Sequence, residues 1–330
     1  MANDLSLPSR QLVTVFGGSG FVGRHVVRAL VQRGYRVRVA VRRPDLAGFL
    51  QPLGTVGQIH AVQANLRYPD SVAAAVKGAV AVVNLVGILQ EGGRQSFAGV
   101  QANGARAVAQ ACAAAGVTRV VHVSAIGAAA ESGSAYARSK AEGEAAVQAA
   151  VPSAIVLRPS IVFGPEDGFF NRFAALARML PVLPLIGGGE TRFQPVFVGD
   201  VAAVIAKAAS SPAAEGVTYE LGGPSVYTMR EILQLILTET GRDRVLLPLP
   251  WFAAGVLGQV GDVMAGVLPI APPITSDQVE MLKSDNVAGN GLPGLAEAGV
   301  VPTSIEAIVP SYLYRYRKGG QYAPTPAGAY

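Results

Sequence analysis

Tyr136 and Lys140 are the two side chains whose types and spacing best fit acid–base chemistry. They stand four residues apart in Tyr136-Ala-Arg-Ser-Lys140, so a helix would place both on one face. A free tyrosine has a pKa of about 10, and a nearby ammonium group must favour the phenolate before the hydroxyl can exchange protons near neutral pH. Such pairs also arise by chance, so the surrounding elements decide whether this pair forms a site.

A glycine-rich segment near the start of the chain, Val-Thr-Val-Phe-Gly-Gly-Ser-Gly-Phe-Val-Gly over residues 13–23, predicts a strand, a phosphate-binding turn and a helix. Gly17 would let the chain turn sharply, Gly20 would let the backbone approach a pyrophosphate, and Gly23 would let the helix pack closely on the sheet. The helix N-terminus would direct amide groups and its positive dipole end at the phosphates. We therefore expect a bound dinucleotide, with a purely structural turn as the alternative.

Arg42 and Arg43 follow the second predicted strand, where an NAD-binding protein usually carries an acidic residue for the ribose hydroxyls. A guanidinium group suits a 2′-phosphate instead, because it offers a planar fork of donors. The sequence therefore favours NADP(H) over NAD(H), with solvated surface arginines as the alternative. Asn65, after the third predicted strand, would bond an adenine edge, and Val86-Gly87 ends the fourth strand near the expected path of the cofactor.

Short β-branched segments alternate with helical patterns through the first half of the chain, which is typical of a parallel sheet in an α/β protein. Val22, Val26 and Leu30 recur at helical spacing, and Gly34 would end that helix. We expect a Rossmann-type doubly wound parallel sheet with a smaller, mostly helical C-terminal lobe. The predicted strands are 12–16, 37–41, 58–63, 79–86, 119–123, 154–157 and 217–221.

Prolines and glycines between residues 181 and 189 interrupt this pattern, so the two parts are not divided by a single cut. Asp200 is placed to cap a helix that runs to about Ser210. We expect the nucleotide-binding domain at residues 8–164 and 195–222, the second lobe at 165–194 and 223–318, and a flexible tail at 319–330.

Composition restricts the class of protein. Half of the 330 residues are apolar and 15% are charged, which allows a large core and excludes global disorder. The net charge of +5 comes from dispersed basic residues and fits an anionic cofactor or an anionic membrane surface. No basic stripe with interleaved aromatic residues points to nucleic acid as a partner.

Cysteine and histidine usage is typical of a reducing compartment and gives no sign of a metal centre. Cys112 is the only cysteine, so no disulfide framework exists. His25, His60 and His122 lack the spacing of metal ligands and fit packing or surface roles. The first ten residues lack a basic region and an apolar run, so we expect no secretory signal.

The segment 245–274 is strongly apolar, carries few charges and has prolines near its ends. The prolines, together with Gln259 and Asp262, argue against a membrane-spanning helix, which needs about 20 clean apolar residues. Two interpretations remain: a helix buried against the second lobe, or a surface helix that docks on a membrane or an apolar partner.

These motifs together resemble the extended or atypical short-chain dehydrogenase/reductase superfamily, over about residues 11–222. The resemblance rests on the glycine loop, on Tyr136 with Lys140, on Arg158-Pro-Ser-Ile-Val-Phe-Gly164 and on Val196-Phe-Val-Gly-Asp200. It implies that Lys140 bonds the nicotinamide ribose, Tyr136 is the catalytic acid or base, and Pro159 lies beside the nicotinamide. The candidate cofactor-binding residues are Gly17, Ser19, Gly20, Phe21, Val22, Gly23, Arg42, Arg43, Asn65, Leu66, Val86, Gly87, Ser124, Tyr136, Lys140, Pro159 and Phe163.

One departure from the superfamily pattern weakens the case for catalysis. The third catalytic group of the superfamily is a Ser or Thr after the fifth strand, and Ala125 stands at that position. The hydroxyl that would orient the substrate and stabilise developing charge is therefore missing. Ser124, or Ser132 and Ser134 in the following loop, are the possible substitutes.

A narrower resemblance, to the NADPH-binding accessory subunit family of respiratory complex I, accounts for this departure. It rests on Val83-Asn-Leu-Val-Gly87, Ser139-Lys-Ala-Glu-Gly-Glu144, Phe163-Gly-Pro-Glu-Asp-Gly-Phe-Phe-Asn171, Gln194-Pro-Val, Leu247-Pro-Leu-Pro250, Ile274-Thr-Ser-Asp-Gln-Val-Glu280 and Gly291-Leu-Pro-Gly-Leu295. Members bind NADPH tightly without turning it over and sit on the peripheral arm, near the membrane where quinone enters. The resemblance implies a cytoplasmic or matrix-side protein, peripheral at the membrane, with segment 245–274 close to that interface.

Three functions remain open at the level of sequence. The first is a non-catalytic NADP(H)-binding protein that belongs to complex I or helps to assemble it. The second is an NADPH-dependent reductase, dehydrogenase or epimerase that acts on an apolar substrate, such as a quinone or an isoprenoid precursor, through Tyr136 and Lys140. The third is a regulator that senses the bound nucleotide.

Overall fold

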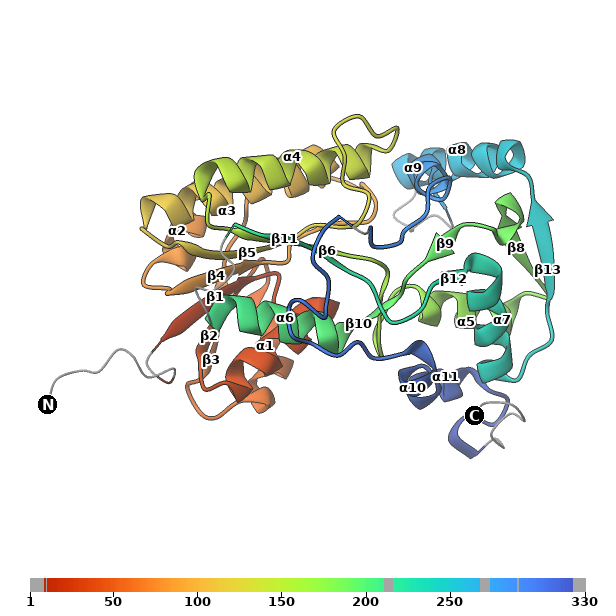
Figure 1. Cartoon of the computed structure of the whole chain (residues 1–330), viewed down its shortest axis with the longest axis horizontal. Coiled ribbons are helices and arrows are strands. Elements are labelled where there is room, and N and C mark those ends of the chain that lie inside the picture. The colour runs from red at the N-terminus through yellow and green to blue at the C-terminus, as the bar shows by residue number, and fades with distance from the viewer. Residues whose placement is uncertain (1–8, 10, 211–215, 268–273, 290, 323–330) are drawn as a thin grey trace, which may run out of the picture.

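A seven-stranded parallel sheet organises one of the two parts of the computed structural model, which describes residues 9, 11–210, 216–267, 274–289 and 291–322 (Figure 1). The strand order is β11-β6-β5-β4-β1-β2-β3, so the chain changes direction across the sheet between β1 and β4. Ligands of such sheets bind at this switch point, beyond the carboxyl ends of the strands. The strands are β1 (Leu12–Phe16), β2 (Arg36–Val41), β3 (Ile59–Gln63), β4 (Ala81–Asn84), β5 (Arg119–Val123), β6 (Ile155–Pro159) and β11 (Thr218–Leu221).

Helices cover both faces of this sheet, as a doubly wound fold requires (Figure 1). Successive side chains of a strand point to opposite faces, so Val15 of β1 packs in one core and Phe16 in the other. One face carries α1 (Phe21–Gln32) and α6 (Val198–Ser210), and the other carries α2 (Pro69–Val76), α3 (Asn103–Ala114) and α4 (Ala135–Ala150). The Rossmann-type fold expected from the sequence is confirmed.

The second part contains short strand pairs and helices around its own aromatic core. Phe163, Phe170 and Leu233 are fully buried there and pack with residues from the C-terminal end of the chain. Its helices are α5 (Phe170–Met179), α7 (Met229–Thr240), α8 (Trp251–Val267), α9 (Ser276–Met281), α10 (Ile305–Ile308) and α11 (Pro310–Leu313). Its strands pair as β7 (Val162–Phe163) with β10 (Val196–Phe197), β8 (Val182–Ile186) with β13 (Val245–Leu249), and β9 (Arg192–Phe193) with β12 (Tyr227–Thr228).

Short helices complete the connections. The 3₁₀ helix η2 (Pro44–Leu53) follows β2, and the π-helix η3 (Ala98–Ala102) leads into α3. Three further 3₁₀ turns are η4 (Gly187–Gly189), η5 (Tyr314–Tyr316) and η6 (Gly320–Tyr322). Residues 320–322 of the tail that the sequence predicts to be flexible therefore form a turn, and 323–330 lie outside the described residues.

Residues 293–303 return from the second lobe to the sheet. Leu295 and Ala298 are buried in the same core as α1 and α6, and the Thr303 N–H and hydroxyl donate to the Asp200 carboxylate at 2.7 and 3.0 Å. Asp200 lies in the first turn of α6, which begins at Val198. The Asp200 carboxylate accepts its hydrogen bonds from Thr303 and not from the amide groups of α6. The expectation that Asp200 caps this helix was therefore wrong, because a distant segment supplies its partners.

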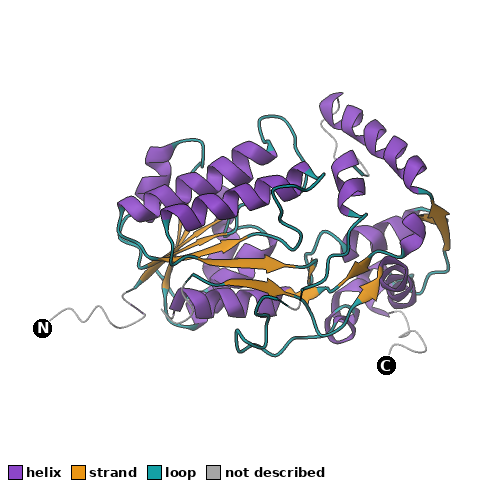
Figure 2. Cartoon of the chain, turned by 45° about the horizontal axis from the view of Figure 1, so that its top comes forward, coloured by secondary structure: helices purple, strands orange, loops and turns teal. Residues whose placement is uncertain are grey.

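Helix α8 lies at the edge of the second lobe beside α9 (Figure 2). Its small residues Ala254, Gly258 and Gly261 face inward, whereas the side chains of Phe252 and Val263 are 78% and 68% exposed. The interpretation of segment 245–274 as a helix buried against the second lobe is therefore wrong. Residues 268–273 of that segment lie outside the described residues. Among the described helices, none is long and apolar enough to cross a membrane.

Candidate dinucleotide-binding site

The glycine loop connects β1 to α1 at the switch point of the sheet. Gly17 has φ +79°, a left-handed conformation that glycine adopts without strain, and its N–H donates to the Ala40 carbonyl. At Gly23 an added Cβ would lie 2.4 Å from the Gly17 carbonyl oxygen, so only glycine allows the helix to pack against the loop. Gly20 is the N-cap residue and supplies no capping side chain, so the first amide groups of α1 lack acceptors within the helix. This geometry fits a phosphate.

The four candidate residues after β2 and β3 lie at the same edge of the sheet. Arg43 is held by Asp45, with guanidinium–carboxylate distances of 3.0 and 2.7 Å, whereas Arg42 is exposed and forms no ion pair within the described residues. The Asn65 amide oxygen accepts from the Arg67 N–H at 3.2 Å, and Leu66 packs against Gly104 of α3. Of the two arginines, Arg42 is therefore the better candidate for a phosphate.

Val86 and Gly87 join the glycine loop to the Tyr136–Lys140 pair. A Cβ at Gly17 would lie 3.3 Å from Val86 Cγ2, and a Cβ at Gly87 would lie 3.2 Å from Lys140 Nζ. The structure thus brings together three regions that are far apart in the sequence. Ser19, Phe21 and Val22 lie in or next to the glycine loop itself.

Tyr136 and Lys140 lie on one face of α4, as predicted, and both are buried. Lys140 Nζ donates to the Val123 carbonyl at 3.2 Å and lies 5.8 Å from the centre of the Tyr136 ring. Burial lowers the pKa of Lys140 to about 8. Burial, with the nearby Asp277 carboxylate, raises the pKa of Tyr136 to about 12. This direction is opposite to the one that acid–base catalysis near neutral pH requires.

The hydroxyl groups considered as substitutes for the one missing at Ala125 differ in their surroundings. Ser124 follows β5 directly, and its buried Oγ has no hydrogen-bond partner within the described residues. Ser134 caps α4, accepting from the Ala137 N–H and donating to Asp277, while the Ser132 hydroxyl accepts from the Ser134 N–H. Ser124 is therefore the only one of the three without a partner within the described residues.

Pro159 lies at the carboxyl end of the sheet, and Phe163 lies beyond it. Pro159 ends β6, and its carbonyl accepts from the Ile126 N–H of the loop that contains Ala125. Phe163 is fully buried, with its ring 5.8 Å from Phe170 and 5.7 Å from Phe197. The structure thus gives Phe163 a packing role in the second lobe, and its contact with a cofactor stays a prediction.

A buried polar pair at the ends of β4 and β5 escaped sequence reasoning. The Asn84 side-chain amide lies 3.2 Å from Nδ1 of His122, and the Asn84 oxygen accepts from the Val86 N–H. Burial, together with the Lys140 charge, lowers the pKa of His122 to about 3, so the imidazole is neutral. His122 Nε2 and the Oε1 of the nearby helix residue Gln101 have no partner within the described residues. The position of Asn84 at a strand end was the signal available in the sequence.

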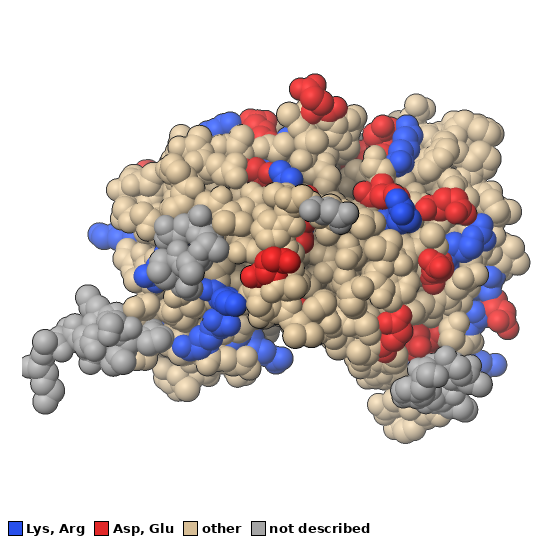
Figure 3. Space-filling view, in the orientation of Figure 1, with Lys and Arg blue, Asp and Glu red and all other residues tan. Residues whose placement is uncertain are grey.

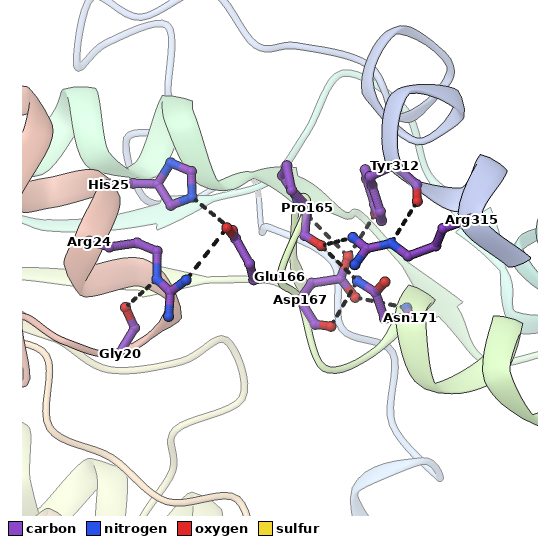
Figure 4. A network of polar contacts seen from close by, with 10 residues as sticks. Gly20, Arg24, His25, Pro165, Glu166, Asp167, Asn171, Tyr312 and Arg315 are labelled. Carbon is purple, nitrogen blue, oxygen red and sulfur yellow. Dashed lines mark hydrogen bonds and ion pairs between the residues drawn. The ribbon is translucent and has the colours of Figure 1, made fainter. Parts of the chain in front are cut away.

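A polar network joins the glycine-loop helix to the second lobe (Figure 4). Glu166 lies 3.5 Å from both Arg24 and His25 of α1. Its neighbour Asp167 accepts from the Tyr312 hydroxyl at 2.7 Å, and the Pro165 carbonyl accepts from Arg315. Neither link was predicted, because residues more than 100 positions apart meet only through the fold.

A cleft of about 780 Å³ lies between α9 and the loop before η3. Phe97 lines it and packs edge-on against the Tyr136 ring, with the ring centres 5.7 Å apart. Four carboxylates also line it, those of Glu91, Asp262, Asp277 and Glu280. Among the described residues, no group of His, Cys, Asp and Glu side chains is arranged to hold a metal ion.

Residues 13–222 match the NAD dependent epimerase/dehydratase family. This match contains the glycine loop, Tyr136 and Lys140 and covers more than half of the chain, so the protein belongs to this family. The resemblance to extended short-chain dehydrogenases/reductases is confirmed.

Similarity to individual proteins extends further along the chain. It is 38% identical to NADH dehydrogenase (ubiquinone) 1 alpha subcomplex subunit 9 of mouse mitochondria over 309 residues, which cover 93% of this chain and 80% of the mouse protein. It is 35% identical to the ceramide reductase of Caulobacter vibrioides, over 74% of this chain and 76% of that protein. The NADPH-dependent quinone oxidoreductase of Escherichia coli, solved with NADPH, shares the fold with a TM-score of 0.71 and 20% identity, over 92% of this chain and 99% of that one. The narrower resemblance to the complex I subunit family is confirmed.

Proposed function

We propose that this protein binds NADP(H) without turning it over and serves respiratory complex I as an accessory subunit or an assembly factor. The observation that carries the proposal is a cofactor-binding site that lacks an effective catalytic acid. The glycine loop, Gly87 and Lys140 are arranged for a dinucleotide, whereas Tyr136 has a raised pKa and Ala125 supplies no hydroxyl. The similarity to subunit 9 over 93% of the chain supports the choice of partner.

The residues present fit the dinucleotide. The glycine positions leave room that a side chain would fill, the first turn of α1 offers amide groups, and Lys140 and the Ser124 hydroxyl lie where the sheet ends. The cofactor would supply a stabilising ligand, and Arg42 would favour the 2′-phosphate of NADP(H) over NAD(H). A ligand that binds only the folded state stabilises it by about 2.7 kcal/mol at a hundredfold excess over Kd.

Helix α8 is the proposed contact with the membrane surface, on the cytoplasmic side in a bacterium or the matrix side in a mitochondrion. Phe252, Val256, Val260 and Val263 are all more than half exposed. In Figure 3 the surface over α8, at the upper right, carries almost no charge. An exposed apolar helix face of this kind is typical of an interface.

Co-purification from native membranes tests the proposal. We expect the protein to migrate with complex I and to release NADPH, identified by mass, on denaturation. Tyr136→Phe should leave both properties unchanged, because neither uses the phenol. A purified protein that carries no nucleotide and shows no thermal shift with NADPH would contradict the proposal.

A working reductase is the second candidate, and the unpaired hydroxyl of Ser124 favours it. In this reading Tyr136 is the acid, Lys140 tunes it and Ser124 replaces the missing hydroxyl. The four carboxylates of the cleft would repel phosphorylated substrates, which leaves an apolar one such as a quinone or an isoprenoid precursor. The similarity to a ceramide reductase is consistent with an apolar substrate.

Two substitutions separate the candidates. Turnover that collapses in Tyr136→Phe would establish the enzyme and exclude the scaffold. If the missing hydroxyl is what prevents turnover, Ala125→Ser should create NADPH oxidation in the presence of a quinone as hydride acceptor, which the natural protein lacks. A nucleotide-sensing regulator would instead show no turnover, and its binding to a partner protein would change with the NADPH/NADP⁺ ratio.

A further inference from the structure

Asp277 reaches from the second lobe to the N-terminal end of α4, the helix that carries Tyr136 and Lys140. Its carboxylate accepts from the Ser134 hydroxyl at 2.9 Å and from the Ala135 N–H at 2.6 Å, and lies 3.4 Å from the Tyr136 nitrogen. The first turn of α4 contains no acidic residue of its own. First-turn amide groups lack acceptors within the helix, and the helix dipole favours a negative charge there. Asp277 therefore caps the N-terminal end of α4, although it lies 142 residues from Ala135 in the sequence.

Helix α9, which carries Asp277, is tightly joined to α8. An added Cβ at Gly258 of α8 would lie 2.8 Å from the Ser276 Cα, so the two backbones are in contact. The Ser276 N–H also lies 3.3 Å from the Asp262 carboxylate of α8. The hydroxyl of Thr275 caps α9 through the Gln278 N–H, which fixes the residues on either side of Asp277. A displacement of α8 must therefore move Asp277.

The same helix pair faces α4 at a second point. A Cβ at Gly133, just before α4, would lie 2.9 Å from the Glu280 carboxylate of α9. The α8–α9 pair thus rests on the start of α4, while the opposite side of α8 is the exposed apolar surface of Phe252, Val256 and Val263. One side of the α8–α9 pair therefore contacts the start of α4, and the other side is exposed.

We propose that Asp277 couples the nucleotide site to the α8–α9 pair, so that NADP(H) binding orders these helices and a membrane surface bound by the apolar face of α8 strengthens NADP(H) binding. This inference rests on the proposed function, because it requires the nucleotide to contact α4 through Lys140. Coupling between two binding sites is reciprocal, so each ligand changes the affinity for the other by the same factor. Asp277 is a positioning residue here, since it acts on the nucleotide through α4.

Hydrogen exchange of the full-length protein, with and without saturating NADPH, tests the coupling. The reporters are the N–H groups of Val279 and Leu282, which bond to the Thr275 and Gln278 carbonyls in α9. Neither residue touches the glycine loop, so a nucleotide bound there cannot slow their exchange by direct contact. In the natural protein we expect NADPH to slow their exchange by about fivefold or more, the lower end of usual coupling strengths.

Two substitutions on one helix make the comparison. Asp277→Asn removes the charge with little change in shape, and should still bind NADPH while the α9 protection falls below about twofold. Glu280→Gln is the matched control, because glutamine keeps the shape that meets Gly133 while removing a charge that pairs with Lys283 and accepts no hydrogen bond from α4. It should keep the full protection. Ser134→Ala, which removes only one partner of Asp277, should reduce the protection in part and serves if Asp277→Asn does not fold.

Two results would overturn the coupling while leaving the proposed function intact: NADPH binds but α9 exchange does not change, or the protection persists in Asp277→Asn. An absence of NADPH binding in the natural protein would instead show that the proposed function itself is wrong, and the coupling with it. The binding isotherm distinguishes these cases before any exchange is measured.

Discussion

Replacing Lys140 by methionine is expected to stabilise the nucleotide-free protein and to weaken its binding of NADPH. The side chain is 6% exposed, and burial lowers the pKa of its ammonium group from 10.5 to about 8. At about 1.4 kcal/mol per pH unit, holding this charge in the folded protein at pH 7 costs about 3 kcal/mol. Methionine has a similar length and no charge, so we expect a gain of about 2 kcal/mol after the loss of the bond to Val123.

The sign of the pH dependence follows from the lowered pKa. The folded protein holds the Lys140 proton only below about pH 8, whereas the unfolded chain holds it up to its ordinary value of 10.5. The cost is therefore fully present below pH 8, shrinks between pH 8 and 10.5, and is absent above. The difference in stability between Lys140→Met and the natural protein should follow the same course, and contributions from other groups cancel in that difference.

Urea unfolding of the nucleotide-free proteins at pH 7 and pH 10, followed by far-ultraviolet circular dichroism, measures the effect. Lys77→Met is the matched control, because Lys77 is exposed and its removal should change stability little at either pH. Titration calorimetry should show NADPH affinity about tenfold lower in Lys140→Met, from the loss of a charge-assisted hydrogen bond. A variant less stable than the natural protein at pH 7, or a difference that is equal at both pH values, would refute the reasoning.

Three further outcomes are expected. Gly23→Ala should lower NADPH affinity about tenfold or more in calorimetry, because its Cβ would meet loop backbone at 2.4 Å. Gly48→Ala is the control and should keep the affinity, since a Cβ there has no atom within 4 Å. Equal affinities in the two variants would contradict the loop geometry. Arg42→Asp should lower the affinity for NADPH at least about tenfold and leave the affinity for NADH unchanged. Arg43→Ala should have a smaller effect, because Asp45 already holds Arg43. An unchanged NADPH affinity in Arg42→Asp would refute the assignment. Asp200→Ala should lower the free energy of unfolding by about 1–3 kcal/mol through the loss of both Thr303 bonds, and unchanged stability in urea would show that this contact is weak.

Local pattern was sufficient to predict the sheet. The strands at 12–16 and 119–123 match the structure, because β-branched runs bounded by turn residues specify a buried parallel strand with little help from the rest of the chain. The predicted strand 79–86 was too long, since the chain leaves the sheet after Asn84 to carry Val86 and Gly87 towards the glycine loop.

The orientation of α8 could not be read from apolar periodicity. Gln259 and Asp262 are its only polar side chains, so hydrophobicity distinguishes the faces of the helix poorly. Residue size distinguishes them instead, because the small residues Ala254, Gly258 and Gly261 are buried while the larger side chains lie outside. At Gly258 the helix backbone contacts Ser276 of α9.

The contacts that tune the candidate site were beyond sequence reasoning for a different reason. The Lys140 spacing suggested an activated phenol, but the pKa of Tyr136 depends on burial and on Asp277 of a distant helix. Asp277 and Glu166 carry no local sign of their partners, since each acts on a helix more than 100 residues away. Chemical type is readable along the chain, whereas electrostatic surroundings exist only after it has folded.

The late return of the chain has a consequence for synthesis. Leu295 completes the core beside the sheet, and Ile305, Val309 and Leu313 complete the aromatic core of the second lobe. A nascent chain that ends before these residues exposes apolar surface in both parts, because neither core is closed from its own segment alone. The protein therefore cannot reach its native state before residues 295–313 have left the ribosome, and until then the nascent chain exposes apolar surface that is prone to aggregation.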